Sequence, residues 1–212
     1  MDKEIQSADV EQHPLKPFTP QHARLLMLGS FPPARSRWSM DFFYPNYIND
    51  MWRVYGLCFF GDKDYFVDVE RKTFRKDLIE EFLTEKGVAL YDTASAVVRT
   101  KGTASDKDLE VVTPTDIKAL LRQLPECRAV VVTGQKAADV FAAQFQIVQP
   151  KVGSFTEFNF EGRQLRLYRM PSSSRAYPMK LERKADRYQR MFHDLGMCWK
   201  SRASLTPEGK RR

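Results

Sequence analysis

The 212-residue sequence predicts an α/β fold: a three-layer sandwich with a central, mainly parallel four-stranded sheet flanked by helices on both faces. Three observations predict it. Four short apolar segments have the composition of buried strands. Segments with helical periodicity separate them, which is typical of parallel sheets. The hydrophobic content of 42% is that of a globular protein, and the length suffices for one core.

The strands are predicted at residues 24–28, 88–91, 129–133 and 165–170. Residues 130–132 are three consecutive valines, and such a continuous β-branched run is expected where helices cover both faces of a strand. The last segment ends at a proline, which closes extended segments well and disfavours helix in the residue before it.

Helices are predicted between these strands from apolar residues that recur every three or four positions. One covers residues 74–83, a second follows Asp116, a third starts near Gln135 and the last covers residues 181–195. Before the second helix, Thr113 is predicted as N-cap, with a proline at the first helical position and Asp116 three residues after the cap. The exposed face of the last helix is expected to carry Arg183, Lys184, Arg187 and Arg190.

Each predicted strand is followed by a polar turn that contains glycine, proline or a carboxylate. Ligands of open parallel sheets bind beyond the carboxyl ends of the strands. We therefore expect most of these turns to gather on one rim and to form the functional site. The turns are residues 29–33 (GSFPP), 92–94 (DTA), 134–135 (GQ) and 171–174 (PSSS).

Positive charge is concentrated toward the C-terminus. Residues 169–212 hold twelve Lys and Arg against four Asp and Glu, a net charge of +8, whereas the whole chain carries +7. A positive field beside three serines is typical of a surface that binds a phosphate backbone. The alternatives are a plain serine-rich turn and a basic tail that only keeps the protein in solution, which suffices for residues 210–212.

The cysteines and histidines indicate neither disulfides nor a metal. Cys58, Cys127 and Cys198 are far apart and odd in number, which is typical of a reducing compartment. Three scattered thiols cannot supply the four ligands of an iron–sulfur cluster, and the three histidines show no ligand spacing with them. We expect no metal and no cofactor, and we expect the histidines to lie at the surface or to pack rather than to catalyse.

No apolar run approaches the roughly 20 residues that span a bilayer, and the polar N-terminus is not a secretory signal. We expect a disordered N-terminus at residues 1–16, one domain at residues 17–200 and a disordered basic tail at residues 201–212. The expected location is a bacterial cytoplasm or nucleoid, or a nucleus, with no membrane attachment and no secretion. We expect a monomer.

The order and spacing of four motifs resemble the uracil-DNA glycosylase superfamily, particularly its mismatch-specific and hypoxanthine-acting branches. The motifs are GSFPP at 29–33, an aromatic loop ending in NDMW at 49–52, VALYDT at 88–93 and MPSSSR at 170–175. The resemblance covers residues 25–195. It implies a monofunctional DNA glycosylase of base excision repair, which flips a damaged or mismatched base out of double-stranded DNA and hydrolyses its N-glycosidic bond.

The resemblance places Gly29, Ser30 and Phe31 along the flipped nucleotide and Tyr44 as the aromatic residue that stacks on the base. Many relatives carry Asp or Asn at the position of Phe31, where it orients the attacking water. Uracil-specific relatives carry Asn at the position of Asp92. An ionised carboxylate only accepts hydrogen bonds, so Asp92 favours a base edge that donates, such as hypoxanthine N1–H or an amino group. The alternatives are that Asp92 caps a turn and that the aromatic residues are core.

The aromatic loop offers a substitute for the missing water-orienting residue. In the hypoxanthine-acting branch an asparagine in this loop carries catalysis, so the resemblance implies that Asn49 orients the water, with Asn46 as the second candidate. Asp50 is the carboxylate in this loop that could act as a base. The alternative is that Asn49 only braces the loop.

The last motif is expected to grip DNA. Its serines would hold phosphates, and Arg175 or Tyr177 would fill the space left by the flipped base. Met170 replaces a histidine of the relatives with uracil activity, which indicates the mismatch-type branch. The DNA-binding residues implied are Ser172, Ser173, Ser174, Arg175, Tyr177, Arg183 and Arg187.

Two other functions are weighed against a glycosylase. A non-catalytic member of the same fold would bind damaged or single-stranded DNA, and Phe31 favours this alternative. A hydrolase or transferase acting on free nucleosides or nucleotides is the third, but a small substrate has no use for a long positive stripe.

Overall fold

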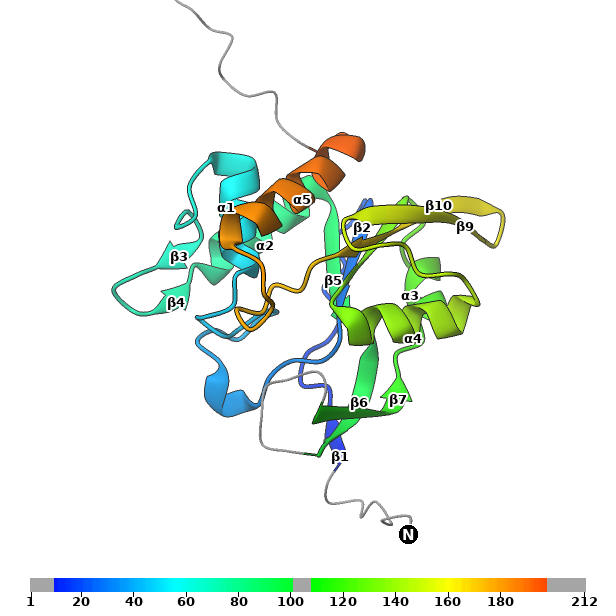
Figure 1. Ribbon diagram of the computed structural model, residues 1–212, viewed down its shortest axis with the longest axis horizontal. Helices are drawn as coiled ribbons and strands as arrows, with labels where there is room; N and C mark the ends of the chain where they lie inside the picture. Colours follow the sequence, from blue (N-terminus) through cyan, green and yellow to red (C-terminus); the bar gives the residue numbers. More distant parts are fainter. Residues whose placement is uncertain (1–9, 101–107, 198–212) are drawn as a thin grey trace, which may run out of the picture.

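The computed structural model describes residues 10–100 and 108–197 and contains a central five-stranded sheet (Figure 1). The strand order is β5-β2-β8-β10-β9. Strands β5, β2, β8 and β10 run parallel, which confirms the four predicted strands. The bounds are Leu25–Gly29 for β2, Val88–Asp92 for β5, Ala129–Thr133 for β8, Ser154–Phe160 for β9 and Arg163–Met170 for β10.

The fifth strand, β9, was not predicted, and the expectation of four strands is therefore corrected to five. β9 pairs antiparallel with β10 through a tight turn at Glu161 and Gly162, whose φ angles are 50° and 80°. Successive positive φ angles give a turn that matches the twist of the two strands. The strand forms the edge of the sheet and exposes side chains such as Phe155, so its burial pattern is weak.

Helices cover both faces of the sheet, as predicted (Figure 1). One face carries α1 (Met51–Phe60), α2 (Lys76–Lys86) and α5 (Leu181–Asp194). The other face carries α3 (Ile117–Arg122) and α4 (Gln135–Phe145). The fold therefore has three layers with an apolar core on each side of the sheet.

The two cores explain the unbroken apolar sequence of the central strands. Successive side chains of a strand point to opposite faces. Leu25 and Met27 of β2 lie in the core beneath α1, α2 and α5, and Leu26 and Leu28 lie in the core beneath α3 and α4. All four side chains are fully buried.

Helix α1 lies in the segment that the sequence indicated only as the end of an aromatic loop. Seven of its ten residues are buried, so it is apolar on almost every side and shows little of the one-sided periodicity by which surface helices are recognised.

A second correction concerns the N-cap of α3. Thr113 lies in β7, and Asp116 is the N-cap, its Oδ1 accepting a hydrogen bond from the Ala119 N–H at 2.9 Å.

A second, three-stranded sheet lies beyond the carboxyl end of β5 (Figure 1). It consists of β1 (Val10–Gln12), β6 (Ala94–Arg99) and β7 (Leu109–Pro114) in the order β1-β6-β7, and a small hairpin is formed by β3 (Val67–Asp68) and β4 (Thr73–Phe74).

Strand β1 corrects part of the expected N-terminal disorder, because residues 10–16 follow a defined path. β1 pairs antiparallel with β6, which gives the segment backbone hydrogen bonds that no local pattern predicted. Residues 1–9 and the predicted tail at residues 201–212 lie outside the described residues.

Candidate functional site

The turns that follow the parallel strands lie on one rim of the sheet, as predicted. Gly29 at the end of β2 pairs in register with Asp92 at the end of β5. Thr133 at the end of β8 pairs with Met170 at the end of β10. Because β2 and β8 are neighbours in the sheet, the two pairs form one continuous edge.

Gly29, Asp92 and Tyr44 converge at this edge. A Cβ atom on residue 29 would lie 2.3 Å from Asp92 Oδ1 and 3.5 Å from Tyr44 Oη, so only glycine fits between these two side chains. Tyr44 Oη also lies 3.3 Å from Thr133 Oγ1, at the end of the next strand. Three residues assigned to base binding are therefore adjacent, and the carboxylate oxygen Oδ1 of Asp92 faces the other two.

The second oxygen of Asp92 has a partner that sequence analysis missed. His13 Nε2 lies 2.9 Å from Asp92 Oδ2, and both side chains are buried. His13 had been expected to lie at the surface or to pack, within a disordered segment. The contact joins residues 79 positions apart and depends on β1, so no local motif indicated it.

Ser30 and Phe31 occupy the turn after β2, and the structure gives a reason for the phenylalanine. Phe31 is buried in a small apolar cluster with Ala94, Val97 and Leu109 of the second sheet. In the superfamily that the sequence resembles, many members carry a polar residue at the position of Phe31. In this protein the second sheet covers that position. Ser30 is also buried, and its carbonyl oxygen accepts from the Ala94 N–H at 3.1 Å.

The aromatic loop and the serine loop are tied together at Asp50. The Asp50 N–H donates to the carbonyl oxygen of Ser173 at 2.9 Å. Its carboxylate accepts from Arg175 Nε at 3.2 Å through Oδ1 and from Lys184 Nζ at 2.9 Å through Oδ2. In Figure 1 the orange loop between β10 and α5 runs beside the segment that leads into α1. Both oxygens of Asp50 are engaged by cations, so these contacts support a role in holding the loops rather than in taking a proton.

Lys184 lies inside the protein, which corrects its predicted place on the exposed face of the last helix. Its side chain is fully buried, and Nζ donates to Asp50 Oδ2 and, at 2.7 Å, to the carbonyl oxygen of Ser174. A buried charge of this kind needs both an ionic partner and further hydrogen bonds. The neighbouring Ala185 and Tyr188 are buried as predicted.

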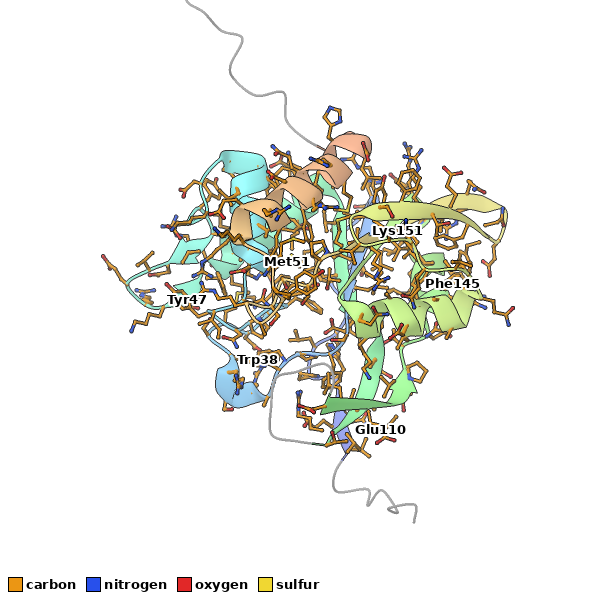
Figure 2. All side chains as sticks on the ribbon, in the orientation of Figure 1. Trp38, Tyr47, Met51, Glu110, Phe145 and Lys151 are labelled. Atoms are coloured by element: carbon orange, nitrogen blue, oxygen red, sulfur yellow. The ribbon has the colours of Figure 1, made fainter. Side chains whose placement is uncertain are left out.

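Asn49 and Asn46 are held by their own loop. Asn49 Oδ1 accepts from the Met51 N–H at 2.9 Å at the start of α1, and Asn46 Oδ1 accepts from the Ile48 N–H at 3.2 Å. Arg53 adds a clamp, since its Nη1 donates to the carbonyl oxygens of Tyr47 at 2.8 Å and Asn49 at 3.1 Å. Met51, which is labelled in Figure 2, is fully buried, so the loop ends at a helix start inside the core.

The serine loop presents hydroxyl groups at the same rim. Ser172 Oγ accepts from the Ser174 N–H and Ser174 Oγ accepts from the Ala176 N–H, each at 3.2 Å. A hydroxyl that accepts still has its own proton to donate, so both side chains can donate to a phosphate oxygen. Ser173 is buried and acts through its backbone, and Tyr177 is half-buried.

No protein-family model and no curated protein sequence matches the chain. One solved structure that does match is the solution NMR structure of a protein from Methanosarcina acetivorans, described as a candidate uracil DNA glycosylase. The TM-score is 0.59 at 19% sequence identity, and the match covers 88% of this chain and 99% of that chain. The chain has the fold of that glycosylase-like protein. At this identity the likeness establishes the fold, which agrees with the resemblance found in the sequence.

Basic residues beside the rim of the glycosylase-like fold differ in their surroundings. Arg183 and Arg190 on α5 are exposed, whereas Arg187 donates to the Val152 carbonyl oxygen at 3.4 Å and packs on Gly153. Arg175 is exposed although it is paired with Asp50. The predicted DNA-binding arginines are thus two kinds: free-standing surface charges and side chains that also support the fold.

A cavity of about 550 Å³ lies elsewhere in the glycosylase-like fold, around β3 and the loop before it. Its wall carries four carboxylates, and its charge is therefore opposite to what a phosphate backbone requires. We therefore place the candidate site at the rim of the central sheet. There the convergent side chains at the ends of the parallel strands meet the basic residues. The residues lining the cavity are Asp62, Asp64, Tyr65, Val67, Asp68, Val69, Glu70 and Arg75.

Within residues 10–100 and 108–197, no cluster of three or more His, Cys, Asp or Glu side chains has an arrangement that could hold a metal ion. None of the helices in the described part of the chain is both long and apolar enough to cross a membrane. Cys58 and Cys127 are buried thiols that are not joined in a disulfide, and Cys198 lies outside the described ranges.

Proposed function

We propose that this protein is a monofunctional DNA glycosylase that hydrolyses the N-glycosidic bond of a flipped-out deaminated or mismatched base. The observation that carries the proposal is the convergence of Gly29 and Tyr44 on Asp92 Oδ1, on the rim where Asp50 joins the aromatic loop to Ser173. A glycosylase needs a place for the extruded base beside a grip on the flanking phosphates, and in this proposal the rim would supply the first and the serine loop the second. The glycosylase-like fold supports the same proposal.

In the proposed reaction a water oxygen forms a bond to C1′ of the sugar, and the bond between C1′ and the base nitrogen breaks. The departing base takes the electron pair of that bond, and the proton of the water passes to solvent. Positioning and electrostatic stabilisation supply most of the catalysis in such a step. We assign the orientation of the water to Asn49, with Asn46 second, and the rigidity of their loop to Arg53 and Asp50.

The choice of base is assigned to Asp92. Its Oδ1 faces Tyr44 and the gap at Gly29, so an ionised Asp92 presents a hydrogen-bond acceptor there. Hypoxanthine can donate from N1–H to this oxygen, and an exocyclic amino group can do the same. We therefore propose a deaminated purine such as hypoxanthine as the preferred base, rather than uracil alone.

Strand cleavage is not part of the proposal. A glycosylase that also cleaves the strand uses an amine that attacks the sugar. Lys184 is the lysine bonded to the candidate loops, and its ammonium group is buried between Asp50 and the Ser174 carbonyl oxygen. This group is therefore already engaged and is not available as a nucleophile.

DNA contact is assigned to the serine loop and α5. The hydroxyls of Ser172 and Ser174 would donate to phosphate oxygens, and Tyr177 or Arg175 would enter the space left by the base. Because Arg175 also pairs with Asp50, insertion of Arg175 would loosen that contact, whereas Tyr177 carries no such cost. Arg183 would extend the contact along the backbone.

A second candidate function is favoured by Phe31. This residue is buried in an apolar cluster and cannot orient water, so a protein of this fold that binds damaged DNA without hydrolysis is the alternative. The two functions differ in one product, the free base.

Release of free base from duplex oligonucleotides tests the proposal. The duplexes carry hypoxanthine, xanthine, uracil or a T·G mismatch, and products are separated by chromatography after reaction with excess protein. We expect free hypoxanthine, intact strands before alkali treatment, and strand breaks after it. Salt-sensitive DNA complexes without any base release would favour the binding protein, and hydrolysis of free nucleosides alone would favour the small-substrate enzyme.

A further inference from the structure

His13 places its imidazole against the carboxylate assigned to base recognition. Nε2 lies 2.9 Å from Asp92 Oδ2, and the His13 side chain is only 2% exposed. With the Asp92 carboxylate ionised, Nε2–H is the donor of this contact, since an ionised carboxylate only accepts. The other ring nitrogen, Nδ1, lies 2.8 Å from the carbonyl oxygen and 3.1 Å from the amide nitrogen of Leu15. Nδ1 therefore has a backbone partner with or without a proton, and the ring keeps one orientation.

The His13 imidazole packs against three aromatic rings beside the candidate site. Its ring centroid lies 4.6 Å from that of Tyr91, 5.3 Å from that of Phe31 and 6.3 Å from that of Phe43. The backbone is anchored as well, because the His13 N–H donates to the Ser95 carbonyl oxygen at 2.8 Å directly after β1. Moving the ring out would break three aromatic contacts and its hydrogen bonds to Asp92 and Leu15 together.

We infer that His13 is a positioning residue that orients Asp92 for base recognition, an inference that rests on the proposed function. The two oxygens of Asp92 have separate surroundings: His13 binds Oδ2, and Oδ1 lies at Gly29 and Tyr44. Holding Oδ2 from one side fixes the direction of Oδ1 on the other. The acceptor that meets the base is then pre-oriented, and a base that donates a hydrogen bond there is selected.

A positioning role for His13 differs from a merely structural role in its effect on base selectivity. Loss of a positioning contact should weaken the binding of a base that donates a hydrogen bond to Asp92. It should leave the binding of a base without that donor unchanged. A structural defect should weaken both equally. The probes are duplexes with a 2′-fluoroarabino nucleotide, which resists hydrolysis, bearing either hypoxanthine or unsubstituted purine opposite thymine. Hypoxanthine can donate from N1, whereas unsubstituted purine cannot.

Fluorescence anisotropy with these two duplexes gives the ratio of dissociation constants. We expect wild-type protein to prefer hypoxanthine by about tenfold, the scale of one hydrogen bond to a charged group. His13→Phe keeps the aromatic packing but removes the donor, and its preference should fall to near unity. His13→Gln, whose amide N–H can replace Nε2–H, should keep most of the preference. In an Asp92→Asn background, His13→Phe should change the ratio no further, because its effect runs through Asp92.

An unchanged ratio in His13→Phe would overturn the inference, and so would tighter binding of both duplexes, which would show that the imidazole blocks the base site. Base release by the wild-type protein is measured separately. If wild-type protein prefers hypoxanthine in binding but releases none, the proposed hydrolysis fails while the role of His13 stands. If it releases hypoxanthine and His13→Phe keeps the same preference, the proposed function stands while the role of His13 fails.

Discussion

Lys184 Nζ lies 2.9 Å from Asp50 Oδ2 and 2.7 Å from the Ser174 carbonyl oxygen, and the lysine side chain is fully buried. One ammonium group therefore joins the aromatic loop, the serine loop and α5. The two loops come from segments more than 100 residues apart, and neither has a strand or helix of its own to hold it against the other. The geometry of the candidate site depends on this contact.

We predict that Lys184→Met destabilises the protein by about 3 kcal/mol, because it leaves Asp50 buried with Arg175 as its remaining cationic partner. The free energy of unfolding is measured by urea denaturation. The double variant Asp50→Asn with Lys184→Met removes both charges and should lose less than the single variant. Equal stability of Lys184→Met and wild type would show that the buried pair does not hold the loops.

Asn49→Ala is predicted to cut the rate of base release by at least about 100-fold while the DNA dissociation constant stays near that of wild type. Asn49 Oδ1 also accepts a hydrogen bond from the Met51 N–H at the start of α1, so a fall in stability of about 1 kcal/mol is expected from the same change. Asn49→Ser is the matched control, since a serine hydroxyl can accept the Met51 N–H but does not replace the amide. If Asn49→Ser releases base at the wild-type rate, Asn49 has no part in the chemistry.

Gly29→Ala is predicted to lower base release by at least about tenfold, because the added methyl group would lie 2.3 Å from Asp92 Oδ1 and displace that carboxylate. Stability should fall as well, since the shift also disturbs the contact with His13. In an Asp92→Ala background the same substitution should cost little further stability. A Gly29→Ala variant with full activity and stability would show that residue 29 and Asp92 do not meet in solution.

Arg183→Ala and Arg190→Ala are each predicted to weaken DNA binding and to reduce the slope of log affinity against log salt by about 1. Both residues are exposed, so the free energy of unfolding should stay unchanged. Arg187→Ala should also lower stability, because Arg187 contacts Val152 and Gly153. Lys118→Ala on α3 removes the same charge from the other layer and serves as control. Identical salt slopes in Arg183→Ala and Lys118→Ala would exclude this face of α5 from the interface.

Cys127 supplies a prediction about pH. Burial raises the pKa of its thiol to about 11 from a model-peptide value near 9. The folded state favours the neutral thiol, so this stabilisation is complete below pH 9 and is lost as the pH rises toward 11. Between pH 8 and pH 10.5, wild-type protein should lose about 2 kcal/mol more unfolding free energy than Cys127→Ala. Parallel loss in the two proteins would show that the thiolate is tolerated in place.

Four strands of the central sheet and four of the helices were predictable because their signals are local. The consecutive valines of β8 indicate a buried strand, and the apolar periodicity of α2, α4 and α5 indicates which side of each helix is buried. The helix α1 was not predicted because it is surrounded by core and has no polar face. Strand β1 was not predicted because three residues acquire structure only through pairing with β6.

The residues of the candidate site also divide into those with a local sequence signal and those that depend on distant contacts. The turns at Gly29, Asp92 and Ser172 follow from parallel topology, which brings the carboxyl ends of the strands together wherever such strands are recognised. The roles of His13 and Lys184 depend on contacts across 79 and 134 residues. Neither residue stands in a motif. Lys184 in particular has the sequence context of an exposed helix face, with a charged neighbour on one side and an alanine on the other.

The central claim is that the four turns form one site for an extruded nucleotide. A crystal structure of the protein with duplex DNA that carries a stable abasic analogue tests it most directly. We predict that the abasic sugar lies beside Asn49, with flanking phosphates on Ser172 and Ser174 and with Asp92 Oδ1 facing the space of the missing base. DNA bound away from this rim, or an abasic site left stacked within the helix, would contradict the account.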